Sequence, residues 1–172
     1  DQAYLQWKPT PSVQLAGGKL ANPFWMVASS DPVWDQDFNP EGFSQSASAL
    51  VGGKLRLFVN ALQMAVDEDS ASTQDQWMLG QQVGLETRLP FQTRIKMAAA
   101  YYDWINETDG SFSQAVVLEG NRRGGGGALL NNFGVGEFTA ELSAWIGHLP
   151  LSIQGTFLKN LAAKDSLTPK ED

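Results

Sequence analysis

The side chains of this sequence that could do chemistry are charged residues on the polar side of an alternating pattern. They are Lys54, Arg56, Glu86, Arg88, Arg94, Lys96, Glu137 and Glu141. If the polar side faces a water-filled lumen, these charges would sort ions, because charged side chains that line a pore give it selectivity. If it does not, they form cross-strand ion pairs that satisfy one another. The pattern leaves both interpretations open.

A second group of polar residues is acidic and lies in one segment of the chain. It consists of Asp31, Asp35, Asp37 and Glu41. Calcium prefers several hard oxygen ligands, which such spacing could supply, but the spacing is not that of an EF-hand. Asp and Asn side chains also close turns through local hydrogen bonds. We expect that structural role, with a metal site as the weaker alternative.

The composition excludes several classes of function. The net charge is −7, whereas a nucleic-acid-binding protein needs a basic surface that replaces counterions. Cysteine is absent and His148 is the single histidine, so thiolate sites and histidine-dependent triads are not expected. The sequence also does not place two carboxylates across one cleft, as a glycosidase requires. We therefore expect no enzyme, no cofactor and no nucleic-acid partner.

The elements that carry these residues alternate with a period of two, which is typical of β-strands with one apolar and one polar face. The clearest hairpin joins residues 77–89 to residues 93–101 through Leu89-Pro90-Phe91. A similar hairpin joins residues 137–146 to residues 151–157 through a second Leu-Pro turn. Proline suits such a turn, where its missing N–H costs nothing.

Two weaker hairpins precede these. One joins strands near 43–51 and 54–66 through Gly52-Gly53, and the other joins residues 4–7 to residues 13–19. The result is an all-β antiparallel meander of about eight strands in a single domain, residues 1–172.

Short turns alternate along the chain with longer loops near 21–42, 67–75 and 105–134. This asymmetry, with strands of about 9–13 residues, is typical of a transmembrane β-barrel with short periplasmic turns.

Aromatic residues cluster near the ends of the predicted strands. They are Trp77, Tyr101, Tyr102, Trp104 and Trp145. Amphipathic rings are favoured at a membrane interface, where one edge is dry and the other is wet. The alternative is that they are ordinary core or loop aromatics.

Residues 19–42 resemble the putative porin family of Gram-negative bacteria. The resemblance rests on Gly18-Lys19, Asn22-Pro23-Phe24, Trp34-Asp35-Gln36-Asp37 and Asn39-Pro40-Glu41-Gly42. A weaker second motif runs from Leu149-Pro150-Leu151 to Lys159-Asn160.

The resemblance implies a barrel in the bacterial outer membrane that lets small hydrophilic solutes or ions diffuse passively. The partners it implies are outer-membrane lipid and the solutes, and it is compatible with a homo-oligomer. It supplies no catalytic residues, and in such proteins long loops, here 21–42, fold inward. Family members have more strands, and the last predicted strand lacks an aromatic end, so we expect part of a larger barrel.

Two other functions remain open from the sequence. One is a non-conducting structural barrel in the outer membrane, or a component of a surface assembly. The other is a soluble β-barrel that binds a ligand. The discriminating feature is whether the apolar face points outward or inward, and alternation alone does not reveal this.

Overall fold

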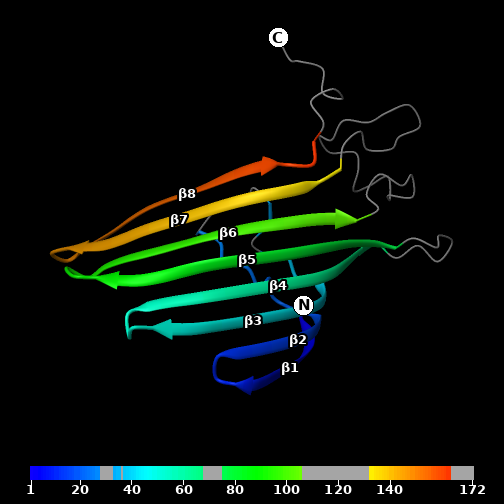
Figure 1. Cartoon of the computed structure of the whole chain (residues 1–172), viewed down its shortest axis with the longest axis horizontal. Helices are drawn as coiled ribbons and strands as arrows, with labels where there is room; N and C mark the ends of the chain where they lie inside the picture. Colours follow the sequence, from blue (N-terminus) through cyan, green and yellow to red (C-terminus); the bar gives the residue numbers. More distant parts are fainter. Residues whose placement is uncertain (28–32, 36, 68–74, 106–131, 164–172) are drawn as a thin grey trace, which may run out of the picture.

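The computed structural model describes residues 1–27, 33–35, 37–67, 75–105 and 132–163. Its strands are β1 (Ala3–Thr10), β2 (Val13–Lys19), β3 (Glu41–Val51), β4 (Leu55–Asp67), β5 (Gln76–Leu89), β6 (Thr93–Ile105), β7 (Gly134–Ile146) and β8 (Leu149–Asn160). Each strand pairs antiparallel with the next in sequence, in a single eight-stranded sheet (Figure 1). The all-β meander predicted from the alternating pattern is confirmed.

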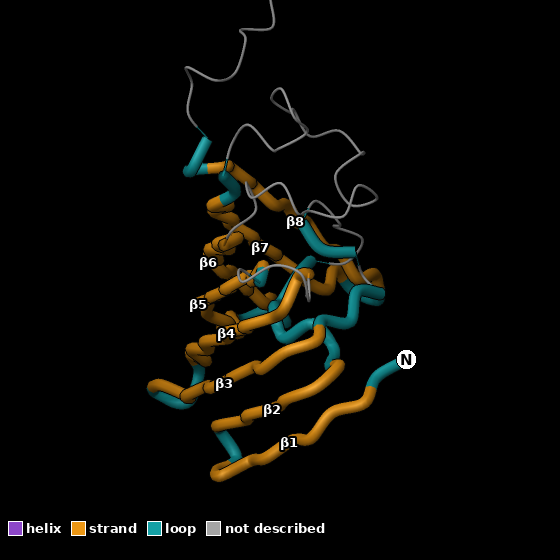
Figure 2. The backbone as a smooth tube through the Cα atoms, turned by 90° about the vertical axis from the view of Figure 1, so that its right-hand side faces the viewer, coloured by secondary structure: helices purple, strands orange, loops and turns teal. Residues whose placement is uncertain are grey.

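The sheet is open in this structure. Among the described strands, β1 and β8 form its two edges and do not pair with each other. The sheet curves strongly, and the connection between β2 and β3 lies within the curve, against the concave face (Figure 2). The described residues contain no helix long and apolar enough to span a membrane.

The apolar face of the sheet points outward, on its convex side. Val83 on β5 is 58% exposed, whereas its neighbour Gln82 is 2% exposed. On β8, Ile153 belongs to the same outward face and is 75% exposed. A surface of large, exposed apolar side chains is suited to contact with the hydrocarbon of a membrane and not with water. This resolves the sense of the alternation.

The buried core therefore lies on the concave side. It is formed by residues of the sheet and of the β2–β3 connection together, namely Leu20, Phe24, Trp34, Leu62, Met64, Met78, Ala100 and Tyr102. A single curved sheet cannot bury one of its faces by itself, so the connecting segment supplies the second layer.

In two of the four short turns, glycine occupies the positions with positive φ angles, as the sequence favours. Gly52 and Gly53 between β3 and β4 have positive φ angles of 59° and 71°, and Gly147 between β7 and β8 has 63°. Between β5 and β6, the positive φ angles fall on Phe91 and Gln92 instead. Non-glycine residues adopt this region at a cost, so this turn is the strained one.

Neighbouring residues on opposite faces of β8 test the orientation of the sheet. We expect Ile153→Lys to lower the stability of the protein folded in lipid vesicles by about 1–2 kcal/mol, because it places a charge toward hydrocarbon. Gln154→Lys is the control, because Gln154 belongs to the concave face. Urea titration of both variants measures the difference, and equal losses would contradict the outward orientation.

Candidate functional site

The concave face is the candidate site, and its long-loop half is covered by residues 20–27, 33–35 and 37–40, together called the inner segment here. The Phe24 ring lies 5.1 Å from that of Tyr102, edge to face. The Trp34 ring lies 5.2 Å from Tyr102 and stacks on Trp104 at 6.2 Å. Aromatic rings at these separations attract one another beyond their buried area, so this cluster holds the inner segment against β6.

A buried glutamine attaches the inner segment to β5. The Trp25 backbone N–H donates to Oε1 of Gln82 at 2.8 Å, and Nε2 of Gln82 donates to the Trp25 carbonyl at 2.9 Å. Asn60 on β4 donates a further bond to Gln82 Oε1 at 3.0 Å. One side-chain amide thereby satisfies both backbone groups of a residue that lies outside any ladder, and this removes the cost of burying them.

Glycines on β5 make room for the rings above them. A Cβ atom at Gly80 would stand 2.5 Å from Phe24 Cζ and 3.1 Å from Tyr102 Cδ1. At Gly84, the same atom would collide with the Phe58 ring. Gly80 therefore allows Phe24 of the inner segment to approach the sheet closely, and Gly84 allows the Phe58 ring of β4 to lie over β5.

The residues of the family motif shape the inner segment. Asn22 Oδ1 accepts a hydrogen bond from the Phe24 N–H at 3.0 Å, an Asx turn that directs Phe24 toward the sheet. Pro40 is fully buried, and its carbonyl accepts from the Leu20 N–H at 2.9 Å, which closes the base of the segment. Pro23 lies between Asn22 and the buried Phe24 and is half-buried.

The acidic residues of this segment make local contacts. The Asp35 carbonyl accepts from the Phe38 N–H at 3.1 Å, and Asn39 Nδ2 donates to the Asp37 carbonyl at 2.7 Å. Glu41, which precedes Gly42 in β3, lies 3.7 Å from Lys19 Nζ. No cluster of three potential metal ligands occurs among the described residues, and Asp31 lies outside them.

A ladder of alternating charge crosses the concave face below the inner segment. The register pairs Arg56 with Glu86, Glu86 with Lys96, and Lys96 with Glu141. Lys96 Nζ lies 4.5 Å from the Trp25 ring centroid and 5.2 Å from that of Phe58. These cation–π contacts mark the deepest point of the inner segment. The register thus sets opposite charges side by side on four strands.

The remaining charged candidates differ in their surroundings. Arg94 donates to Glu141 at 2.5 Å and lies 3.8 Å from Glu86. Glu137 is buried, and its carboxylate accepts from the Tyr102 hydroxyl at 2.5 Å and from the Thr139 hydroxyl at 3.0 Å. Lys54 is exposed in the β3–β4 turn. Glu137 thus belongs to the covered part of the face.

The predicted interface aromatics do not lie together. Trp77 and Tyr101 are on the convex face, 40% and 42% exposed. Tyr102 is fully buried and Trp104 half-buried, both on the concave face, so the interface prediction is wrong for these two. Trp145, at the short-turn end, lines a pocket on the concave side. Tyr102 and Trp104 pack against the rings of the inner segment and do not lie on the lipid-facing surface.

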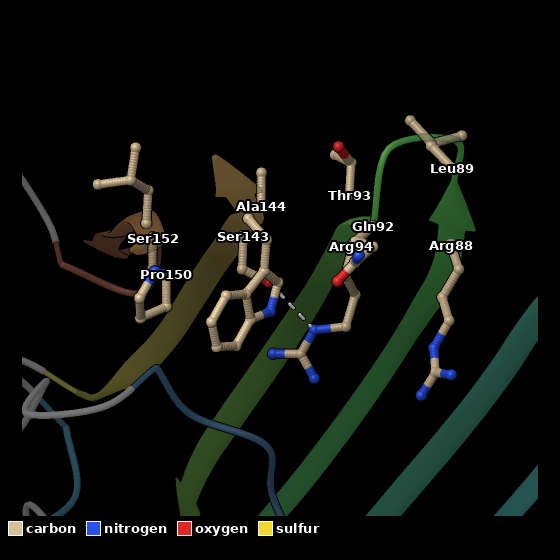
Figure 3. Close-up of a pocket in the computed structure, with 11 residues that line it drawn as sticks. Arg88, Leu89, Gln92, Thr93, Arg94, Ser143, Ala144, Pro150 and Ser152 are labelled. Carbon is tan, nitrogen blue, oxygen red and sulfur yellow. Dashed lines mark hydrogen bonds between the residues drawn. The ribbon is translucent and has the colours of Figure 1, made fainter. Parts of the chain in front are cut away.

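The pocket lies at the short-turn end of the concave face and has a volume of about 590 Å³. Figure 3 shows the side chains of Arg88 and Arg94 pointing to the same side of β5 and β6. Arg94 Nε donates to Ser143 Oγ at 3.3 Å. The concave face is therefore apolar and covered at one end, and charged and open at the other.

A comparison with protein-family models assigns the chain. The model described as Putative porin matches residues 1–127, which include the whole inner segment and β1 to β6. The chain belongs to the Putative porin family. Its porin-like character agrees with the outward apolar face, and its open antiparallel meander is consistent with a β-barrel. No curated protein and no solved structure matches this porin-family chain.

The match ends before β7, so the second motif, from Leu149 to Asn160, lies outside it. Sequence reasoning missed the part played by Gln82, Gly80 and Trp25 in this porin-family site. The only signal was that Gly80 and Gln82 fall on the polar side of β5.

The close approach at Gly80 gives a direct test of the packing. We expect Gly80→Val to displace Phe24 and to lower the free energy of unfolding by about 1–3 kcal/mol, since overpacking forces neighbours to shift. The inner segment should also become sensitive to protease. Gly155→Val is the control, because no atom lies within 4 Å of its Cβ position. Equal protease resistance in both variants would refute this packing.

Proposed function

We propose that the concave face lines a water-filled lumen through which small hydrophilic solutes or ions diffuse passively across the bacterial outer membrane. The observation that carries the proposal is the sense of the alternation, with Val83 outward and Gln82 inward on β5. A soluble barrel would have the opposite arrangement, with its apolar face inside. Membership of the Putative porin family supports the same function.

The size of the apolar face supports a membrane-spanning role. On β5 it runs from Trp77 to Leu89. At ~3.4 Å per residue and a strand tilt of ~40°, this distance corresponds to about 30 Å along the membrane normal. The hydrocarbon core of a bilayer has a similar thickness. We propose on this basis that Trp77 lies at the membrane interface, whereas Tyr101, which pairs with Gln81, lies further along the apolar face.

The inner segment would narrow the lumen without lining its whole length. It covers the concave face down to Trp25, above Lys96 and Phe58. The charged ladder begins at that level, where Trp25 and Phe58 lie over Lys96. We therefore propose Arg56, Lys96 and Glu86 as lumen-lining residues at the narrow point.

The edges of the sheet indicate how the lumen closes. Backbone groups of β1 and β8 that face hydrocarbon would need hydrogen-bond partners, since an open edge is not tolerated there. An eight-stranded barrel has an interior that side chains alone fill, and here the inner segment also occupies it. We propose that these edges pair with further strands in a wider barrel. A homo-oligomer remains a prediction.

A second candidate function is a non-conducting structural barrel. Its support is the density of the covered half, where Leu62, Met78 and Tyr102 are at most 2% exposed. A closed barrel whose whole interior were packed this densely would leave no path for solutes or ions. The two functions differ in whether ions pass.

Single-channel recording in planar lipid bilayers separates these functions. We expect the purified protein to insert and give discrete conductance steps. Gln82→Ala should raise the conductance, because it removes both hydrogen bonds to Trp25 and so loosens the inner segment. Gln154→Ala, on the same face but away from the inner segment, serves as the control. Insertion without current in wild type and in Gln82→Ala would favour the structural barrel.

A further inference from the structure

Two arginines occupy directly opposed positions on neighbouring strands at the short-turn end of the concave face. The β5–β6 register places Arg88 directly opposite Arg94. Like charges in such a pair are destabilising, since directly opposed residues have Cβ atoms only about 5 Å apart. The next row of the sheet alternates in sign, so this pair breaks the pattern of the ladder above it.

The contacts of the pair leave positive charge unbalanced. Arg94 contacts Glu141 and Glu86. In the described part of the chain, the structure records no ion pair or hydrogen bond for Arg88. Arg56 donates to the Ser48 hydroxyl at 3.2 Å, not to a carboxylate. This end of the concave face therefore has four cations, Arg56, Arg88, Arg94 and Lys96, and only two carboxylates, Glu86 and Glu141. The local excess of positive charge contrasts with the net charge of −7 for the whole chain.

The surroundings of the pair suit an oxyanion. Arg88 and Arg94 line the pocket of about 590 Å³ with Ser143 and Ser152, whose hydroxyl groups can donate hydrogen bonds, and with Trp145 (Figure 3). A guanidinium presents a planar fork of donors that matches the two oxygens of a carboxylate or phosphate. An anion bound in this pocket would offset the repulsion that the register imposes.

We propose that this pocket binds small oxyanions, carboxylates or phosphates, and makes the lumen prefer anions. The proposal deepens the proposed function and rests on it for the transport step only. Binding itself requires only the folded sheet. Trp145 offers an apolar surface to the organic part of a carboxylate. Phosphate therefore serves as the probe for an inorganic oxyanion, and benzoate as the probe for an organic carboxylate.

Arg88→Gln is the decisive variant, because it leaves no recorded ion pair broken. Isothermal titration of the folded protein in detergent micelles with phosphate, and then with benzoate, measures the affinity. We expect Arg88→Gln to weaken binding of both by about threefold to fivefold, the range for partly exposed ionic contacts. Arg88→Lys should give an intermediate loss, since it keeps the charge but not the fork.

Lys159→Gln is the matched control, since it removes the same charge from an exposed β8 residue near the long-loop end. It should leave both affinities unchanged. Reversal potentials in a KCl gradient should shift toward cations in Arg88→Gln and not in Lys159→Gln.

Phosphate binding that depends on Arg88 in a protein without conductance would support the site and reject the pore. Conductance in a protein whose phosphate affinity is absent, or is unchanged in Arg88→Gln, would reject the site and leave the pore intact. Weakening of equal size in Lys159→Gln would also reject the site, since it would indicate a general effect of net charge.

Discussion

A pleated strand sends successive side chains to opposite faces, and each face of this sheet meets a different environment. The convex face carries large apolar residues such as Val83 and Ile153, which are exposed at 58% and 75%. The concave face holds most of the charged side chains of the strands, together with the residues that pack against them. The inner segment, the charged ladder and the pocket all follow from this division.

The concave face is organised along the strands by the register. Near the long loops, Gly80 and Tyr102 form a floor for the rings of the inner segment. Toward the short turns, the rows become polar and then charged, and they end at Arg88 and Arg94. This change from apolar to charged rows gives the two ends of the concave face different properties. Packing immobilises the end near the long loops, whereas the end near the short turns keeps its charges accessible to water.

The sequence predicted the elements well and their surroundings poorly. The period of two placed β5 within one residue and the start of β6 at Thr93, although β6 continues four residues past the predicted end, because each strand has a nearly uninterrupted apolar face. It could not give the sense of that face, since the same alternation serves a soluble barrel. Tyr102 and Trp104 were misassigned because an aromatic near a strand end has the same signature in a girdle and in a core. The partner of Gln82 lies 57 residues away, and no local pattern reports such a contact.

The attachment of the inner segment to Gln82 also constrains the order of folding. The hairpins of the meander form between neighbours in sequence, and such local contacts form early. The inner segment, in contrast, must wait for β4, β5 and β6, because its partners Phe58, Gln82 and Tyr102 belong to strands that follow it. Its docking is therefore a late step, and a chain interrupted before β6 would expose Phe24 and Trp34 without a surface to cover them.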